Sequence, residues 1–131
     1  METEKRSVEK IASVSAGKMV LNPVATRAAI DGYKRAIRFY RNPTDKIYET
    51  VRLGDFCYRA RYGMEALKAY REAITLCFEN ESKRSPRFKE VARYCANRIS
   101  IVYRDILGGT DTFDIEQKRV EEFYSSQFYN K

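Results

Sequence analysis

The sequence predicts an all-α protein in which antiparallel helix pairs stack as a short right-handed array. Two stretches that nearly repeat each other support this, because residues 29–37 and 66–74 both read Ala, aliphatic, two variable residues, Tyr, basic, variable, Ala, Ile. The copies begin about 37 residues apart, a period typical of repeats built from helix pairs. Polar and apolar residues alternate only weakly, so no strand is expected. The pairs are expected to meet through the small residues of the two copies, Ala29, Ala36, Ala66 and Ala73.

The first two of five or six helices are predicted over residues 4–19 and 25–41. Pro23 follows the first and Pro43 follows the second, each preceded by Asn. Proline lacks a backbone donor and restricts the residue before it. Both Asn-Pro pairs are therefore predicted to terminate helices.

The third and fourth helices are predicted over residues 45–62 and 64–79. Gly63 separates them and is expected to act as a left-handed cap at the end of the third helix. A connection this short folds two helices back on each other, so an antiparallel hairpin is expected.

The fifth helix is predicted to begin with Ser85 as N-cap and Pro86 at its first position, and to end before Gly108. Its apolar residues alternate between spacings of four and three, which predicts a seam packed on a neighbouring helix. These residues are Phe88, Ala92, Cys95, Ile99, Val102 and Ile106. A last helix is predicted over residues 113–128.

Composition argues against an enzyme. The 131 residues fit one domain, and the chain has no His, which is the commonest general base and a common metal ligand. No Gly-rich phosphate loop follows a strand, and no nucleophile has an evident base. We therefore expect no catalytic residue, no metal and no cofactor. The three Cys are far apart in the sequence, which favours buried free thiols in a reducing compartment.

The charge pattern favours an acidic partner. The formal net charge is +7, and the basic excess is concentrated in residues 27–41 and 83–104. No apolar run approaches the roughly 18 residues that a membrane span needs. The first residues carry charges of both signs, unlike a signal peptide, so a cytoplasmic location is expected.

Residues 47–80 resemble a tetratricopeptide repeat, a 34-residue helix pair. Leu53-Gly54, Ala66, Tyr70 and Ala73 match the signature of that family, whereas its early Trp, first-helix Tyr and terminal Pro are absent. Residues 10–43 match more loosely, and residues 84–128 keep two helices without the signature. A second resemblance, over residues 52–107, is to the three-helix microtubule-interacting and trafficking domain. It leaves the N-terminal copy unexplained, so it ranks second.

The tetratricopeptide resemblance implies a concave groove lined by the first helix of each pair, where Lys, Arg and Asn hold carboxylates of a peptide. The implied function is that of a non-enzymatic adaptor or scaffold for an acidic peptide or partner protein. A solvated helix face is the other interpretation of the same residues. The candidate contact residues are Tyr48, Asp55, Tyr58, Arg59, Arg93, Asn97 and Arg104.

Two further surfaces carry alternative hypotheses. A basic stripe on the second helix could bind phosphates, which would make the protein a nucleic-acid-binding one. It consists of Arg27, Lys34, Arg38 and Arg41. The aromatic C-terminal segment either caps the helical stack or forms a homo-oligomer contact. Its residues are Phe123, Tyr124, Phe128 and Tyr129.

Overall fold

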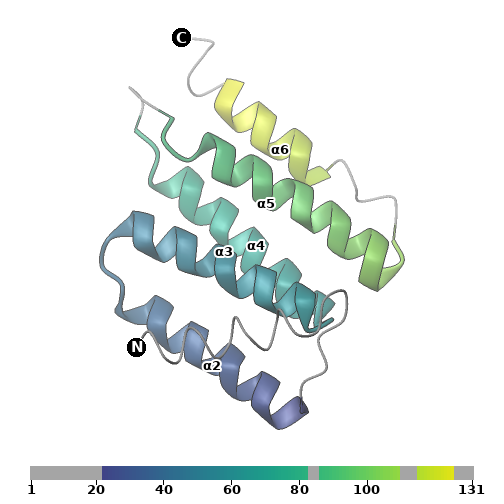
Figure 1. Cartoon of the computed structure of the whole chain (residues 1–131). Coiled ribbons are helices and arrows are strands. Elements are labelled where there is room, and N and C mark those ends of the chain that lie inside the picture. Colours follow the sequence, from purple (N-terminus) through teal and green to yellow (C-terminus); the bar gives the residue numbers. More distant parts are fainter. Residues whose placement is uncertain (1–21, 83–85, 110–114, 126–131) are drawn as a thin grey trace.

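The computed structural model describes residues 22–82, 86–109 and 115–125. All the secondary-structure elements assigned within these ranges are helical. The elements are α2 (Pro23–Phe39), α3 (Pro43–Arg59), α4 (Gly63–Glu79), α5 (Lys89–Val102), the π-helical turn η1 (Tyr103–Leu107) and α6 (Ile115–Tyr124). Successive helices run antiparallel side by side (Figure 1), which confirms the predicted all-α array. The helix expected over residues 4–19 lies outside the described residues.

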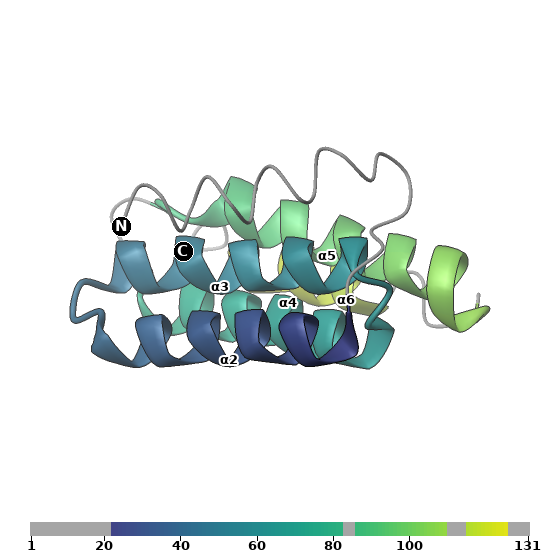
Figure 2. The same ribbon diagram turned by 60° about the horizontal axis from the view of Figure 1, so that its bottom comes forward.

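The helices form two layers (Figure 2). Helices α2, α4 and α6 share one layer, because Glu65 of α4 pairs with α2 and Arg71 of α4 pairs with Glu116 of α6 at 3.4 Å between Nε and Oε2. Helices α3 and α5 share the other layer, where Tyr94 of α5 bonds to Asp55 of α3. Every second helix therefore faces the same side of the molecule.

Each Asn-Pro pair begins a helix, and Asn42-Pro43 also follows the end of α2. The Asn22 side chain accepts a hydrogen bond from the Val24 backbone N–H at 2.7 Å, and Asn42 does the same for Thr44 at 2.8 Å. Proline then occupies the first helical position, where no backbone donor is needed. Helices α2 and α3 consequently start two residues earlier than predicted.

The turn between α3 and α4 differs from the prediction in its capping residue. Arg61, not Gly63, has the left-handed backbone, with φ of 67°. Gly63 instead begins α4 and is buried, and a Cβ there would lie 2.9 Å from side-chain atoms of Ile106 and Leu107. Glycine is thus required at this position for the close approach of η1, a tertiary contact that local sequence does not reveal.

The start of α5 also differs. The helix begins at Lys89 after Phe88, and the Phe88 backbone N–H donates to Oε2 of Glu81 at 2.8 Å. Pro86 precedes the helix instead of occupying its first position, and Ser85 lies outside the described residues. At the other end Gly108 adopts φ of 72°, which confirms the predicted helix stop.

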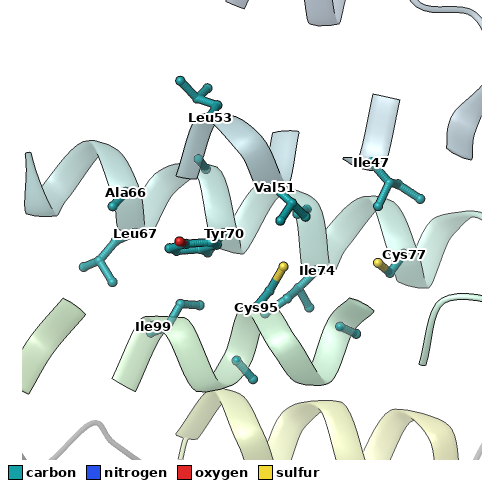
Figure 3. Close-up of a cluster of buried hydrophobic side chains, with 14 of the residues drawn as sticks. Ile47, Val51, Leu53, Ala66, Leu67, Tyr70, Ile74, Cys77, Cys95 and Ile99 are labelled. Atoms are coloured by element: carbon teal, nitrogen blue, oxygen red, sulfur yellow. The ribbon is translucent and has the colours of Figure 1, made fainter. Parts of the chain in front are cut away.

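The core is centred on α4, between α3 and α5 (Figure 3). Tyr70, Ala66 and Ala73 are fully buried, and the Tyr70 ring packs directly over Gly54 of α3. The three cysteines are buried free thiols, as predicted. Burial raises the pKa of the Cys57 and Cys77 thiols to about 12, so both stay protonated at neutral pH.

Helix α6 closes the array through its aromatic residues. Phe123 stacks on Phe78 with ring centroids 4.0 Å apart. Tyr124 is buried and donates its hydroxyl to Oε2 of Glu81 at 2.5 Å. The expectation that Tyr124 is an oligomer contact is therefore corrected, because its own chain already covers the ring. Phe128 and Tyr129 lie outside the described residues.

In the part of the chain that the structure describes, no helix has the length and apolar character needed to cross a membrane.

Candidate functional site

The seam between α3 and α5 carries a network of polar side chains around Asp55. Its carboxylate accepts a hydrogen bond from the Tyr70 hydroxyl of α4, and the Tyr94 hydroxyl of α5 lies 3.0 and 3.1 Å from its two oxygens. Burial and the nearby Asp55 charge raise the pKa of Tyr94 to about 12, so the hydroxyl keeps its proton and donates. Asp55 of α3 is thus bonded to side chains of two other helices, α4 and α5.

Arg98 occupies the same seam, with its guanidinium carbon 4.5 Å from the centroid of the Tyr58 ring and 6.0 Å from that of Tyr94. Its Nε lies 3.4 Å from the Tyr70 hydroxyl oxygen and 3.9 Å from Oδ1 of Asp55. Cation–π attraction and the nearby carboxylate fix the side chain between two rings. Arg98 therefore lies within the seam between α3 and α5, beside Asp55 and Tyr70.

A second carboxylate, Asp105, closes the seam at the π-helical turn. The Tyr58 hydroxyl donates to Oδ2 at 2.6 Å, Nε of Arg104 donates to Oδ1 at 2.9 Å, and Nη2 of Arg61 donates to the Asp105 backbone carbonyl at 3.0 Å. The bonds from Arg104 and Tyr58 hold the pKa of Asp105 below its usual value. η1 thus fastens the end of α5 to the α3–α4 turn.

Above this seam lies a surface that we call the α3–α5 face. Its side chains are Tyr48, Arg52, Arg59, Arg61, Tyr94, Asn97 and Arg104, all exposed. On α3 the residues Tyr48, Arg52 and Arg59 recur at helical spacing, so they project from the same side. Arg52 pairs with Glu49 at 3.1 Å between Nη1 and Oε1. The face carries four arginines. Arg61 and Arg104 are bonded to Asp105, like Arg52 to Glu49, whereas Arg59 has no partner among the described residues.

Four of the residues predicted to contact a partner lie on this face and two lie beneath it. Tyr48, Arg59, Asn97 and Arg104 are exposed on the face. Asp55 and Tyr58 are half-buried in the seam, where they orient other side chains.

Arg93 is directed to α6 instead of to the face. Its Nε and Nη2 bond to both carboxylate oxygens of Glu121 at 2.7 and 2.9 Å, and Nη1 bonds to Glu90 at 2.9 Å. This bidentate pair attaches the last described helix to α5. The expected role of Arg93 in partner contact is corrected accordingly.

Sequence reasoning missed Arg52, Arg61, Tyr94 and Arg98. Tyr94 and Arg98 are four residues apart on α5, and this spacing could have placed them on one side of the helix. Arg61 could not be found in this way, because its position depends on an unforeseen left-handed turn.

Two of the four residues of the predicted phosphate-binding stripe are paired with an acidic residue of α4. Glu65 pairs with Arg27 at 3.6 Å and with Lys34 at 3.4 Å between nitrogen and oxygen. Arg38 and Arg41 are exposed beyond this cluster.

No group of three or more His, Cys, Asp or Glu residues is arranged to hold a metal ion within residues 22–82, 86–109 and 115–125. An open hollow of about 560 Å³ lies between α4 and α6, away from the α3–α5 face, and its lining includes Phe78, Ile115 and Phe123. Comparison of the chain with protein-family models, curated proteins and solved structures gives no match.

Proposed function

We propose that the protein is a non-enzymatic interaction module that binds an acidic peptide or partner protein on the α3–α5 face. The observation that carries this proposal is the charge on the face. Its four arginines are exposed, and Arg59 has no carboxylate partner among the described residues, whereas Arg52, Arg61 and Arg104 each bond to an acceptor of this chain. An acidic partner would supply a carboxylate to Arg59 and further acceptors to the exposed N–H groups of the other three.

The chemistry of the face suits a peptide. Exposed guanidinium groups form directional, charge-assisted hydrogen bonds with carboxylates. Tyr48 and Tyr94 are 48% and 43% exposed, so each offers an amphipathic ring beside these cations. The network beneath fixes Tyr94 before any partner arrives, which lowers the entropy cost of binding.

The arrangement of helices supports the same proposal. Alternate helices occupy one layer (Figure 2), and the candidate residues belong to α3, α5 and the turns that follow them. This is the surface that the tetratricopeptide resemblance assigns to peptide binding. An adaptor or scaffold needs only such a surface, without catalytic groups.

The test is selection from a random peptide library followed by affinity measurement. Peptides rich in Asp and Glu should be selected, and Arg59→Glu/Arg104→Glu should weaken their binding by about tenfold or more. The matched control is Arg35→Glu/Arg38→Glu, which makes the same change in net charge on α2. Selection of neutral peptides, or equal weakening by both double variants, contradicts the proposal.

The same control tests the nucleic-acid alternative. If the parent protein shifts RNA or DNA in a gel with a steep loss of affinity at higher salt, and the α2 variant abolishes that shift, phosphate binding by α2 replaces the peptide proposal. The peptide proposal expects no shift at physiological salt.

A further inference from the structure

The outer surface of α2 carries both exposed apolar side chains and exposed basic side chains. Phe39 is 84% exposed and Val24 is 77% exposed, the two highest values among the large apolar residues of the described chain. Fifteen residues separate them, slightly more than four helical turns, so both lie on the same side of α2. Between them Ala28 is exposed, and a Cβ added at Gly32 would meet no atom within 4 Å. We call this surface the α2 outer face.

Basic side chains lie among and beside the apolar residues. Arg35, Arg38 and Arg41 are exposed, and none of them has a partner among the described residues. Asp31 is the one acidic residue in α2. The Arg27 and Lys34 side chains form the edge next to α4, where they share Glu65. The α2 outer face therefore has a large apolar side chain at each end, with arginines between and beside them.

We propose that the α2 outer face docks on a bilayer surface rich in anionic lipid. Basic and apolar side chains exposed on one helix face can hold that helix in the plane of the interface, with the apolar side chains near the boundary of headgroups and acyl chains. Phe39 and Val24 would enter the bilayer at opposite ends of α2. The arginines beside them would extend their charged ends to lipid phosphates.

The charge of the face favours a bilayer over a second copy of the chain. Two α2 outer faces in contact would bring their arginines together, with only Asp31 of each copy to balance them. Nucleic acid would satisfy the arginines, but phosphate contacts leave Phe39 and Val24 without an apolar environment. An anionic bilayer offers both negative charge and apolar volume.

This docking does not depend on the proposed peptide binding. The α2 outer face belongs to the layer of α2, α4 and α6, whereas the α3–α5 face belongs to the other layer (Figure 2). Both surfaces could therefore be occupied at the same time, which would place an acidic partner at a membrane.

The first experiment uses fluorescence, because the chain contains no Trp. Phe39→Trp places one reporter on the α2 outer face, and Tyr48→Trp places a control reporter on the α3–α5 face. The full chain is mixed with vesicles of one part phosphatidylserine to two parts phosphatidylcholine, or of phosphatidylcholine alone. We expect a blue shift and protection from acrylamide at position 39 with the anionic vesicles only. An unchanged spectrum at position 39, or equal shifts at both positions, overturns the proposal.

The second experiment separates apolar insertion from general basic attraction. In vesicle flotation, Phe39→Ser and Arg35→Glu/Arg38→Glu should each reduce binding to anionic vesicles, the double variant by about tenfold or more. Arg52→Glu/Arg59→Glu, with the same change in charge on α3, should leave vesicle binding unchanged. Equal loss in both double variants, or retained binding by Phe39→Ser, overturns the proposal. If the parent protein does not float with vesicles but binds RNA, and Arg35→Glu/Arg38→Glu loses that RNA binding, the proposal is overturned in favour of nucleic acid.

Discussion

The two copies of the Ala-Tyr-Ala pattern have nearly the same sequence and different environments. In α4, Ala66, Tyr70 and Ala73 are all fully buried, with 0% exposure. In α2 the corresponding Tyr33 and the two alanines are only half-buried. Helix α4 is enclosed by α3, α5 and α6, whereas among the described elements α2 packs mainly on α3. The pattern thus sets which residues share a helical face, and the neighbours determine how deeply that face is buried.

Packing around the two tyrosines shows the same difference. The Tyr70 ring is held over Gly54 and its hydroxyl bonds to Asp55. Tyr33 meets Phe56 of α3 at 5.5 Å between ring centroids, in a tilted arrangement. The predicted meeting of helices through small residues therefore applies fully to Ala66 and Ala73, and to a lesser degree to the alanines of α2.

The largest expected effect comes from removing the two rings. Tyr70→Ala should lower the free energy of unfolding by about 3–5 kcal/mol, because it leaves a cavity between three helices and removes a donor to Asp55. Tyr33→Ala should cost about half as much, because the side chain is only half-buried. Urea denaturation monitored by circular dichroism measures both. Equal losses would show that the copies are equivalent in energy despite their different burial.

Enlarging the alanines tests the same comparison in the opposite direction. Ala73→Leu should cost about 1–3 kcal/mol, because a fully buried and well-packed site has no room for three more carbon atoms. Ala36→Leu should cost less than about 1 kcal/mol, because its side chain can extend toward solvent. Thermal unfolding of both variants provides the measurement. A cost at Ala36 as large as that at Ala73 would contradict this difference in burial.

The sequence predicted the helices well because their signals are local. The breakers Pro43 and Gly108 follow observed helix ends, and the buried seam of α5 follows the predicted spacing from Phe88 to Val102. Pro23 is observed as the start of α2, and the helix it was predicted to end lies outside the described residues. The predicted start of α5 was wrong, because the helix begins after Phe88, whose backbone N–H donates to Glu81 of the preceding loop. A contact of this kind depends on the folded loop and not on a short-range pattern.

The candidate site was predicted only in part for the same reason. The tetratricopeptide resemblance indicated Tyr48 and Arg59, and helical spacing on the fifth helix indicated Arg104, all of which are exposed. Neither could show that Arg93 bonds to Glu121 on α6. Nor could either show that a π-helical turn would place Asp105 beside Tyr58. Side-chain pairing between distant segments decides which charges remain available to a partner.

A smaller effect is expected from the Tyr70 hydroxyl alone. Tyr70→Phe keeps the ring over Gly54 and removes one hydrogen bond to Asp55, which still has Tyr94 and Arg98 nearby. The expected loss is about 1–2 kcal/mol. Comparison with Tyr70→Ala by denaturation then separates the contribution of the ring from that of the hydroxyl. If both variants lose the same stability, the hydrogen bond dominates and the packing argument fails.

In the last comparison, the change in stability is expected to be opposite in sign for a glycine on the open face of α2 and a glycine packed against the second copy. Gly32 of α2 stands where the second copy has Ala69, and a Cβ at Gly32 would meet no atom within 4 Å. Gly32→Ala should therefore stabilise the protein by about 0.5–1 kcal/mol, because Ala loses less backbone entropy than Gly in a helix. Gly54→Ala should destabilise it, since the new Cβ would lie 2.7 Å from Cε1 of the buried Tyr70 ring. The shift of the unfolding midpoint measures both. Opposite signs would show that helix propensity governs the open face of α2 and close packing governs the contact between α3 and α4. Destabilisation by Gly32→Ala would mean that the outer face of α2 is covered in solution.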